Sequence, residues 1–214
     1  MKKKIAINGF GRIGRLTLRA FFEKKTEEFE ISAINDLGNV ESNIHLYKYD
    51  TVHGKCKQEI NNNSGIVTID NQKIKFLSEP NPLKLPWRDL DIDLVIESTG
   101  FFTDRNGAER HLEAGAKKVL ISAPAKDPDF TVVYGVNDND LIDDHKIVSN
   151  ASCTTNCLAP LAYLLENSVG LESGYMTTVH SVTGDQNTID TIHKDLRRAR
   201  NSLISIIPTS TGAA

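Results

Sequence analysis

The stretch that decides the fold lies at the start of the chain and runs Lys4-Ile5-Ala6-Ile7-Asn8-Gly9-Phe10-Gly11-Arg12-Ile13-Gly14. Its first five residues are apolar at alternate positions and include β-branched side chains, which predicts a β-strand. From Ile13 to Phe22 apolar side chains recur at helical spacing, which predicts an α-helix. The three glycines therefore lie on the turn between a strand and a helix.

Glycines with this spacing on a strand-to-helix turn are typical of a dinucleotide-binding site. Gly9 permits the tight turn, Gly11 lets the backbone approach a pyrophosphate, and Gly14 lets the helix and the strand pack closely. The amides and the dipole at the helix N-terminus then favour the anion. We expect Arg12 and Ile13, which lie between these glycines, to belong to the same site.

An acidic residue follows near the distance at which such sites bind ribose. Residues 30–36 predict a second strand that ends in Asp36, 22 positions after Gly14. A carboxylate there accepts hydrogen bonds from both ribose hydroxyls and repels a 2′-phosphate, so the expected cofactor is NAD rather than NADP. The alternative is a tight turn without a ligand, with Asp36 as a capping residue.

Strands and helices continue to alternate after Asp36. Strands are predicted at 66–69 and 73–76, as a hairpin, and at 92–96, 118–122, 129–134 and 146–149, with helices at 40–47, 104–114 and 153–166. The alternation predicts an α/β fold, a Rossmann-type doubly wound parallel sheet with helices on both faces. Ligands bind at the carboxyl ends of such strands, so we expect Ser98, Thr99 and Ser122 in the cofactor site.

The composition excludes several classes of protein. Of the 214 residues, 39% are hydrophobic and 25% are charged, which provides a core and excludes a disordered chain. The formal net charge of −3 disfavours a nucleic-acid partner. No apolar run is long enough to cross a bilayer, and the N-terminal run is too short and interrupted for a signal peptide. Three cysteines make no disulfide framework, so we expect a cytoplasmic protein without a membrane partner or a metal site.

A cysteine lies where a further helix is expected to begin. The predicted strand 146–149 leads into Asn150-Ala151-Ser152-Cys153-Thr154-Thr155-Asn156-Cys157. At a helix N-terminus the amides and the dipole lower the pKa of a thiol, and the thiolate is a nucleophile. The same amides stabilise an oxyanion formed by its attack. The residues alone leave open whether Cys153 is this nucleophile or a small buried residue, and Cys157 is interpreted as structural.

Segments spread over the whole chain match one family in order. They are residues 8–15, 49–54, 97–102, 178–183, 195–200 and 207–214, and the most specific is Ser-Asn-Ala-Ser-Cys-Thr-Thr-Asn-Cys-Leu-Ala-Pro at 149–160. Together they resemble the phosphorylating glyceraldehyde-3-phosphate dehydrogenases, a family of glycolytic enzymes.

The resemblance implies that Cys153 and His180 are the catalytic pair. Cys153 would attack the aldehyde carbon of glyceraldehyde 3-phosphate to give a hemithioacetal. His180 would activate the thiol and take the hydroxyl proton as hydride leaves for NAD. Inorganic phosphate would then release 1,3-bisphosphoglycerate from the thioester. Taken by itself, His180 fits a core or surface histidine better than a catalytic base.

The resemblance also implies two phosphate-binding groups of residues. Thr183 and Asp185 would lie at the substrate phosphate. The site for inorganic phosphate would consist of Ser152, Thr154, Arg198, Thr211 and Gly212. Without the resemblance, the arginines at 197, 198 and 200 fit a solvated charge cluster.

The resemblance divides the chain into two parts. Residues 1–150 would be the NAD-binding Rossmann domain, and residues 151–214 the start of an α+β catalytic domain with one helix, about two strands and a long loop. Residues 181–205 resemble the family's S-shaped loop, which implies a homotetramer, and Gly184 stands where the family often has Asn.

The resemblance stops at Ala214, inside a family motif, with roughly the last third of the family pattern outside this sequence. Two alternatives to the active dehydrogenase stay open. One is a catalytically inactive NAD-binding fragment, and the other, within the family, is an erythrose-4-phosphate dehydrogenase.

Overall fold

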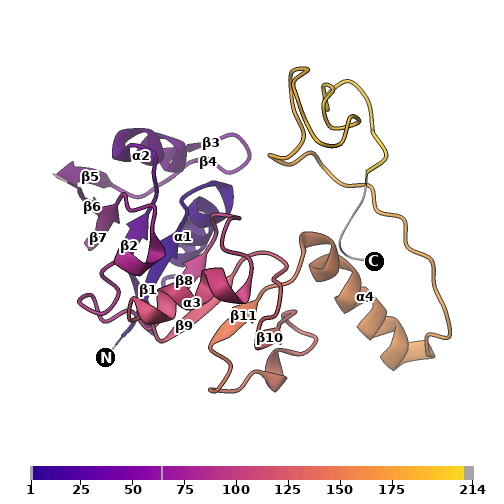
Figure 1. Ribbon diagram of the computed structural model, residues 1–214, viewed down its shortest axis with the longest axis horizontal. Coiled ribbons are helices and arrows are strands. Elements are labelled where there is room, and N and C mark those ends of the chain that lie inside the picture. Colours follow the sequence, from indigo (N-terminus) through magenta and orange to yellow (C-terminus); the bar gives the residue numbers. More distant parts are fainter. Residues whose placement is uncertain (1, 64, 210–214) are drawn as a thin grey trace. The chain divides into compact units, whose positions relative to one another are not determined.

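The computed structural model describes residues 2–63 and 65–209. Two compact units make up the chain, Met1–Ala151 and Ser152–Ala214. Among the described residues, the first unit carries all of the β-sheet structure, and the second begins with a long helix and continues in irregular backbone (Figure 1).

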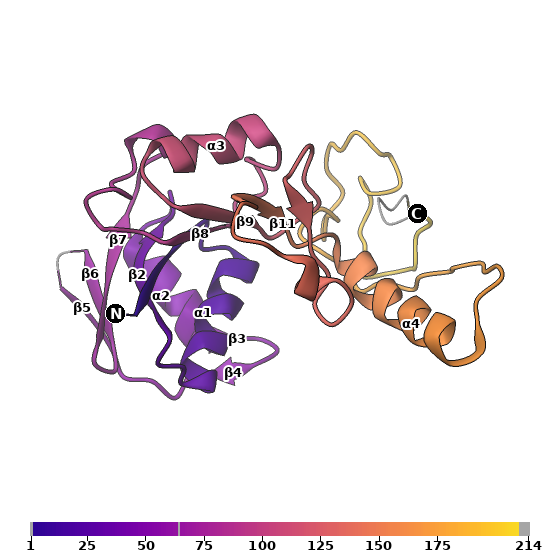
Figure 2. The same ribbon diagram turned by 90° about the horizontal axis from the view of Figure 1, so that it is seen from below.

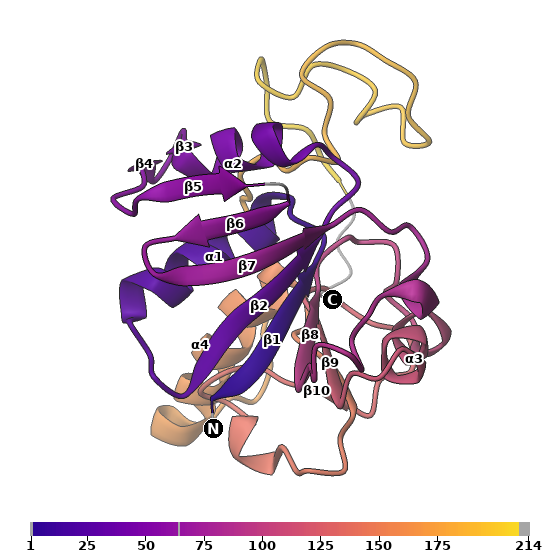
Figure 3. The same cartoon turned by 90° about the vertical axis from the view of Figure 1, so that its left-hand side faces the viewer.

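A nine-stranded sheet forms the centre of the first unit, in the order β10-β11-β9-β8-β1-β2-β7-β6-β5 (Figure 3). All neighbours from β10 to β7 pair in parallel, whereas β6 and β5 are antiparallel to their neighbours. The strands are β1 (Lys3–Asn8), β2 (Phe29–Asn35), β5 (Ile60–Asn63), β6 (Ile66–Ile69), β7 (Gln72–Leu77), β8 (Leu94–Glu97), β9 (Lys118–Ile121), β10 (Phe130–Thr131) and β11 (Ile147–Ser149). The predicted fold class is confirmed.

Helices cover both faces of this sheet. Figure 2 shows α3 (Arg105–Glu113) on one face, and α1 (Arg12–Lys24) and α2 (Val40–Lys48) on the other. A separate two-stranded ribbon, β3 (Tyr49–Asp50) with β4 (Gly54–Lys55), follows α2. Short 3-10 helices lie at Pro82–Lys84 and Asp138–Asp140.

The alternation of side chains along β1 builds the two apolar layers. Ile5 and Ile7 are buried with Leu18 of α1, whereas Ala6 is buried with Trp87 in a second cluster. Successive side chains of a strand point to opposite faces, so one short apolar run supplies both layers.

A bulge in β2 keeps this pattern in phase. Ile5 pairs with Ile31, but Ala6 pairs with Ala33, so Ser32 is an extra residue in the ladder. Such an insertion shifts the alternation of the strand by one position. Ile31 and Ile34 therefore belong to one apolar cluster, although they lie three residues apart.

One predicted strand is shorter than expected. The pattern predicts a strand at 129–134, but β10 contains only Phe130 and Thr131. The side chain of Asn137 ends it, because Oδ1 accepts from the amide of Val133 at 2.8 Å and Nδ2 donates to the carbonyl of Thr131 at 3.0 Å. Asparagine side chains compete in this way with ladder hydrogen bonds.

The described part of the second unit, residues 152–209, contains one helix, α4 (Cys153–Val169), which extends three residues beyond its predicted end. The prediction of about two strands is wrong for residues 152–209, because backbone groups there bond across loops, as in Thr191 N to Ala199 O and Ser202 N to Asn187 O. Apolar side chains of α4 are exposed, among them Leu161, Tyr163, Leu164, Leu165 and Val169. In the part of the chain that the structure describes, no helix is long and apolar enough to cross a membrane.

Candidate active site

The glycine turn brings β1, α1 and β8 into close contact. Gly9 has φ +93°, and a Cβ built on it would lie 2.6 Å from the amide nitrogen of Thr99. A Cβ on Gly14 would collide with the carbonyl oxygen of Gly9. Both positions therefore require glycine, whereas a Cβ on Gly11 would meet no atom within 4 Å.

The first turn of α1 differs from that of the other α-helices in the described residues. The side chains of Asn39, Asp104 and Ser152 cap α2, α3 and α4 by accepting from backbone amides. The N-cap of α1 is Gly11, which has no side chain to cap the helix, and, as in α3 and α4, its first turn contains no acidic residue. The amides of this turn and the open space at Gly11 fit the pyrophosphate of a dinucleotide.

Asp36 links the end of β2 to the glycine turn. Its Oδ2 accepts from the amide of Phe10 at 2.7 Å, and its Oδ1 accepts from the amide of Gly38 at 2.8 Å and from Nδ2 of Asn43 at 3.1 Å. A carboxylate has about four acceptor positions. These contacts therefore leave about one acceptor position, on Oδ2, where the sequence predicted bonds to both ribose hydroxyls.

Three further residues predicted for the cofactor site lie directly after strands of the sheet. Ser98 and Thr99 follow β8, and Ser122 follows β9. Oγ of Ser98 donates to the carbonyl oxygens of Asn8 and Gly9 at 3.1 and 2.7 Å, which holds β8 against the glycine turn.

The two remaining predicted residues begin α1. Ile13 is exposed, and Arg12 donates through NH1 to Oδ2 of Asp50 at 2.9 Å. The amide of His53, with further donation from Val52 and Arg12, holds the pKa of Asp50 well below its usual range.

A thiol and an imidazole meet in the second unit. Sγ of Cys153, the first residue of α4, lies 3.3 Å from Nε2 of His180. Nδ1 of His180 lies 2.6 Å from the carbonyl oxygen of Ser181, which can only accept. The Nδ1 proton is therefore fixed, and Nε2 is the ring nitrogen that exchanges a proton with the thiol.

The surroundings of both groups favour their charged forms. Burial raises the pKa of Cys153, but the hydrogen bond and charge of His180 and donation from Thr154 outweigh it, so the pKa lies below its usual value. The Ser181 carbonyl and then Cys153 raise the pKa of His180 above its usual value. This pair has the features of an activated nucleophile with its base. Cys157 is exposed and free.

The structure gives Ser152 and Thr154 local partners. Oγ of Ser152 accepts from the amide of Thr155 at 2.9 Å and lies 2.6 Å from its hydroxyl, so Ser152 is the N-cap of α4. Thr154 is buried, and its amide and hydroxyl donate to the sulfur of Cys153.

A second polar cluster surrounds Arg198. Its NH1 pairs with Oδ2 of Asp185, and its Nε donates to Oγ1 of Thr209 at 2.8 Å. The Arg198 hydrogen bond is the largest cause that lowers the pKa of Asp185. Nε2 of His193 lies 3.5 Å from Oδ1 of the same carboxylate. The structure thus brings together Asp185 and Arg198, which the family resemblance assigned to two different phosphates.

Thr183 has a partner that sequence reasoning missed. Its amide and its hydroxyl both donate to Oε1 of Gln186, at 2.6 and 2.9 Å. Gln186, His193 and Thr209 were not predicted, although Thr209 lies in the quoted segment 207–214. The predicted residues Thr211 and Gly212 lie outside the described residues. Across 2–63 and 65–209, no group of three or more acidic, histidine or cysteine side chains is arranged to hold a metal.

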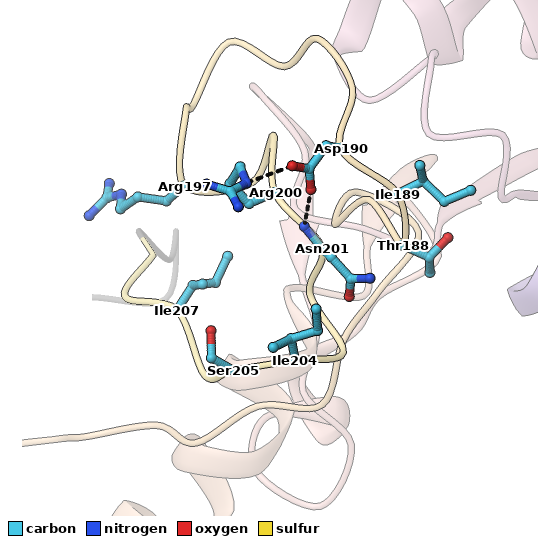
Figure 4. A pocket seen from close by; sticks show the side chains of 9 residues that line it. All are labelled: Thr188, Ile189, Asp190, Arg197, Arg200, Asn201, Ile204, Ser205 and Ile207. Carbon is cyan, nitrogen blue, oxygen red and sulfur yellow. Dashed lines mark hydrogen bonds and ion pairs between the residues drawn. The ribbon is translucent and has the colours of Figure 1, made fainter.

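The loop after Thr183 lines an open cavity of about 590 Å³ (Figure 4). Asp190 links residues of one wall of this cavity, because its carboxylate accepts from Nε of Arg200 at 2.8 Å and from the amide of Asn201 at 3.0 Å. The side chain of Arg197 extends away from this pair in Figure 4, and Asp195 binds its guanidinium. The remaining lining residues are Thr188, Ile189, Ile204, Ser205 and Ile207.

Two family models match this chain. Residues 3–105 match the model described as glyceraldehyde 3-phosphate dehydrogenase, NAD binding domain, and residues 152–214 match the one described as glyceraldehyde 3-phosphate dehydrogenase, C-terminal domain. The boundary between the two structural units falls at the start of the second match.

Curated relatives are similar over the whole chain. The glyceraldehyde-3-phosphate dehydrogenase of Xanthobacter flavus is 54% identical over 214 residues, which is 100% of this chain and 64% of that protein. The Thermotoga maritima enzyme is 53% identical over 99% of this chain and 63% of its own length, and the Zymomonas mobilis enzyme is 55% identical over 100% and 64%. This chain thus spans about 64% of the length of such relatives. It belongs to the glyceraldehyde-3-phosphate dehydrogenase family.

Proposed function

We propose that this chain belongs to an NAD-dependent phosphorylating glyceraldehyde-3-phosphate dehydrogenase. Such an enzyme converts glyceraldehyde 3-phosphate, NAD and inorganic phosphate to 1,3-bisphosphoglycerate and NADH through a thioester on Cys153. The contact of 3.3 Å between Sγ of Cys153 and Nε2 of His180 carries this proposal. The three relatives named above are called glyceraldehyde-3-phosphate dehydrogenase and not erythrose-4-phosphate dehydrogenase, so the latter alternative is not favoured.

The geometry of the pair accounts for the chemistry on sulfur. Nε2 of His180 takes the thiol proton, and the thiolate attacks the aldehyde carbon to form a hemithioacetal. The imidazolium returns this proton to the alkoxide oxygen as the hemithioacetal forms, and the neutral Nε2 then accepts it from the hydroxyl as hydride leaves the carbon. Cys153 is the first residue of α4, where first-turn amides stabilise negative charge on the carbonyl oxygen. Phosphate finally displaces the thiolate from the thioester.

NAD supplies the acceptor for the hydride when it is bound. Gly9 and Gly14 permit the tight turn, the uncapped first turn of α1 faces the pyrophosphate, and Asp36 accepts from a ribose hydroxyl. The open space at Gly11, where a Cβ would touch nothing within 4 Å, supports this assignment. Arg12, Ile13, Ser98, Thr99 and Ser122 complete the proposed cofactor site.

The phosphate-binding roles rest on charge and hydroxyl groups in the second unit. Arg198, with the hydroxyl of Thr209 beside it, provides the cation that a phosphate dianion requires. Asp185 pairs with Arg198 in this structure, so we propose that phosphate binding displaces or reorients that carboxylate. Thr183, Ser152 and Thr154 supply further donors, with Thr211 and Gly212 proposed from the family pattern.

We also propose a homotetramer in the cytoplasm, with residues 1–150 as the cofactor domain and 151–214 as the start of the catalytic domain. The resemblance of residues 181–205 to the S-shaped loop of the family supports the tetramer. Analytical ultracentrifugation of the complete polypeptide tests it, and a monomer would contradict it.

Formation of NADH from aldehyde, NAD and phosphate tests the proposed function, with the intact mass recorded on the same sample. We expect turnover that requires phosphate and disappears in Cys153→Ser. A sample of 23.7 kDa that binds NAD without turnover would instead identify an inactive cofactor-binding fragment.

A further inference from the structure

Four polar side chains are buried beneath the glycine turn. Asn8, Asn35, Glu97 and His111 expose 1%, 5%, 1% and 0% of their surface. The first three end the adjacent strands β1, β2 and β8, and His111 comes from α3 on one face of the sheet (Figure 2). None of these residues has a role in the proposed chemistry. Burying so many polar groups is costly unless every donor meets an acceptor.

Trp87 fixes the direction of hydrogen bonding at one end of this network. Its indole Nε1–H, which can only donate, lies 2.9 Å from Nδ1 of His111. Nδ1 is therefore the unprotonated acceptor, and the proton of the neutral ring is on Nε2. Nε2 lies 3.0 Å from Oε2 of Glu97, so His111 donates to that carboxylate.

The backbone of Glu79 fixes the direction at the other end. Its amide donates to Oδ1 of Asn35 at 2.8 Å, and its carbonyl accepts from Nδ2 of Asn35 at 2.9 Å. Nδ2 of Asn35 also donates to Oδ1 of Asn8 at 2.7 Å. The amide group of Asn8 is thereby oriented, and its Nδ2 donates to Oε2 of Glu97 at 2.6 Å.

The hydrogen bonds from both ends of the network lead to Glu97, which accepts them. Its Oε2 accepts from Asn8 and His111, and its Oε1 accepts from the amide of Thr99 at 2.8 Å and from the Thr99 hydroxyl. Oγ1 of Thr99 itself accepts from the amide of Phe101 at 3.1 Å, so its own proton is available for Glu97. Four donors satisfy the ionised carboxylate and leave no place for a proton on it.

This anion connects the two loops that border the proposed cofactor site. Asn8 immediately precedes Gly9, and Thr99 lies in the turn whose amide nitrogen would be 2.6 Å from a Cβ on Gly9. A shift of either loop would therefore lengthen the bonds that its residues make to Glu97.

We propose that Glu97 is a positioning residue of the dinucleotide site, an ionised carboxylate that locks the glycine turn of β1 to the Ser98–Thr99 turn of β8 through Asn8 and Thr99. The inference rests on the proposed binding of NAD at this edge. It assigns no contact between Glu97 and the cofactor, because Glu97 is buried below the loops. His111 and Trp87 set the direction of the bonds and do not touch the ligand in this assignment.

The first test exchanges an acceptor for a donor without a change of size. In E97Q one carboxylate oxygen becomes an amide nitrogen, which is a donor. This nitrogen faces either the two donors of Thr99 or the donors of Asn8 and His111. We expect the affinity for NAD, measured by calorimetry on the 214-residue chain, to fall about tenfold or more. Ile74→Val, in the apolar cluster that contains Ile5 and Ile7, is the control for a general loss of stability and should keep the affinity.

A double variant makes the test specific for hydrogen-bond direction. In N8D/E97Q the carboxylate moves to position 8, where it accepts from Asn35, from the new amide at 97 and from His111, whose Nε2 lies 3.4 Å from the present Nδ2 of Asn8. The new amide oxygen at 97 keeps both donors of Thr99. We expect recovery of NAD affinity to within about threefold of the unsubstituted protein. Equal affinity of E97Q and the unsubstituted protein, or no recovery in the double variant, would overturn the proposal.

A measurement on the unsubstituted protein does not depend on whether the variants fold. Nitrogen-15 NMR at pH 7 should show His111 as the neutral Nε2–H form, with H111N used to assign it among the six histidines. The single indole N–H signal, from Trp87, should shift in E97Q and return toward its position in N8D/E97Q. A proton on Nδ1 of His111 would contradict the network. Absence of NAD binding by the unsubstituted chain would overturn the proposed function, and the NMR pattern of His111 would still decide the network.

Discussion

Nε2 of His180 lies 3.3 Å from Sγ of Cys153, although 27 residues separate them and only Cys153 is on a helix. The ring can face the sulfur in this way because the carbonyl of Ser181 holds Nδ1 at 2.6 Å. Without that acceptor, either ring nitrogen of the neutral histidine could carry the proton. The backbone acceptor next in the chain thus prepares His180 as a base for the thiol.

Alkylation distinguishes Cys153 from the other two cysteines. Cys153 and Cys157 are both exposed on α4, whereas Cys56 is buried, so Cys157 is the matched control for access. We expect iodoacetamide at neutral pH to modify Cys153 first, because His180 and Thr154 hold the pKa of Cys153 below its usual value. Peptide mass spectrometry after limited reaction measures the order. Labelling of Cys157 or Cys56 ahead of Cys153 would contradict the assignment.

The dependence of alkylation on pH reports the pairing with His180. The pKa of Cys153 lies below its usual value, so the rate should fall only when the pH drops through that lowered value and the sulfur is protonated. The pKa of His180 is raised, so the positive charge that stabilises the thiolate persists to a higher pH than in an ordinary imidazole and is lost as the pH rises through that raised value. His180→Asn should move the midpoint of the rate profile back toward that of an ordinary thiol. An unchanged midpoint in this variant would remove His180 from the pair.

Cofactor selection depends on the carboxylate at position 36. The two oxygens of Asp36 accept from the amides of Phe10 and Gly38, so Asp36→Asn keeps an acceptor for one of these amides while it removes the negative charge. We expect the preference for NAD over NADP to shrink about tenfold, because repulsion of the 2′-phosphate is lost. Binding constants for both cofactors give this ratio, and Asp50→Asn serves as a control for loss of a nearby charge. A ratio that stays the same would remove the ribose role of Asp36.

Two alanine substitutions separate folding from cofactor binding. Gly9→Ala places a Cβ 2.6 Å from the amide nitrogen of Thr99 at a positive φ, so it should lower the free energy of unfolding by about 2 kcal/mol or more. Gly11→Ala meets no atom within 4 Å, so it should leave the stability nearly unchanged and yet weaken NAD binding by filling the approach to the helix amides. Urea titration and calorimetry measure the two effects. Similar stability of both variants would show that the close approach at Gly9 is not required.

Local patterns predicted most of the first unit. The alternation in β1, the apolar spacing in α1 and the polar turn between β6 and β7 are set by neighbours in sequence, and the structure contains each of these elements. The early end of β10 escaped prediction because it depends on the orientation of one side chain, that of Asn137. The Glu97 network escaped prediction for another reason. Asn8 lies 89 residues before Glu97 and 103 residues before His111 in the sequence, and no periodic pattern extends over such separations.

Hydrogen exchange should divide the chain at the boundary between its two units. All three buried apolar clusters found in the described residues lie in the first unit, and β1 contributes to two of them and is bonded to both β2 and β8. The apolar side chains Leu164 and Val169 of α4 are 63% and 80% exposed, so little burial protects that helix in this 214-residue chain. We therefore expect amides of β1 to exchange through global unfolding, and those of α4 at least a hundredfold faster through local opening. Exchange measured by mass spectrometry on peptides covering 3–8 and 153–169 gives the comparison, and equal protection would show that α4 is stabilised as strongly as the sheet.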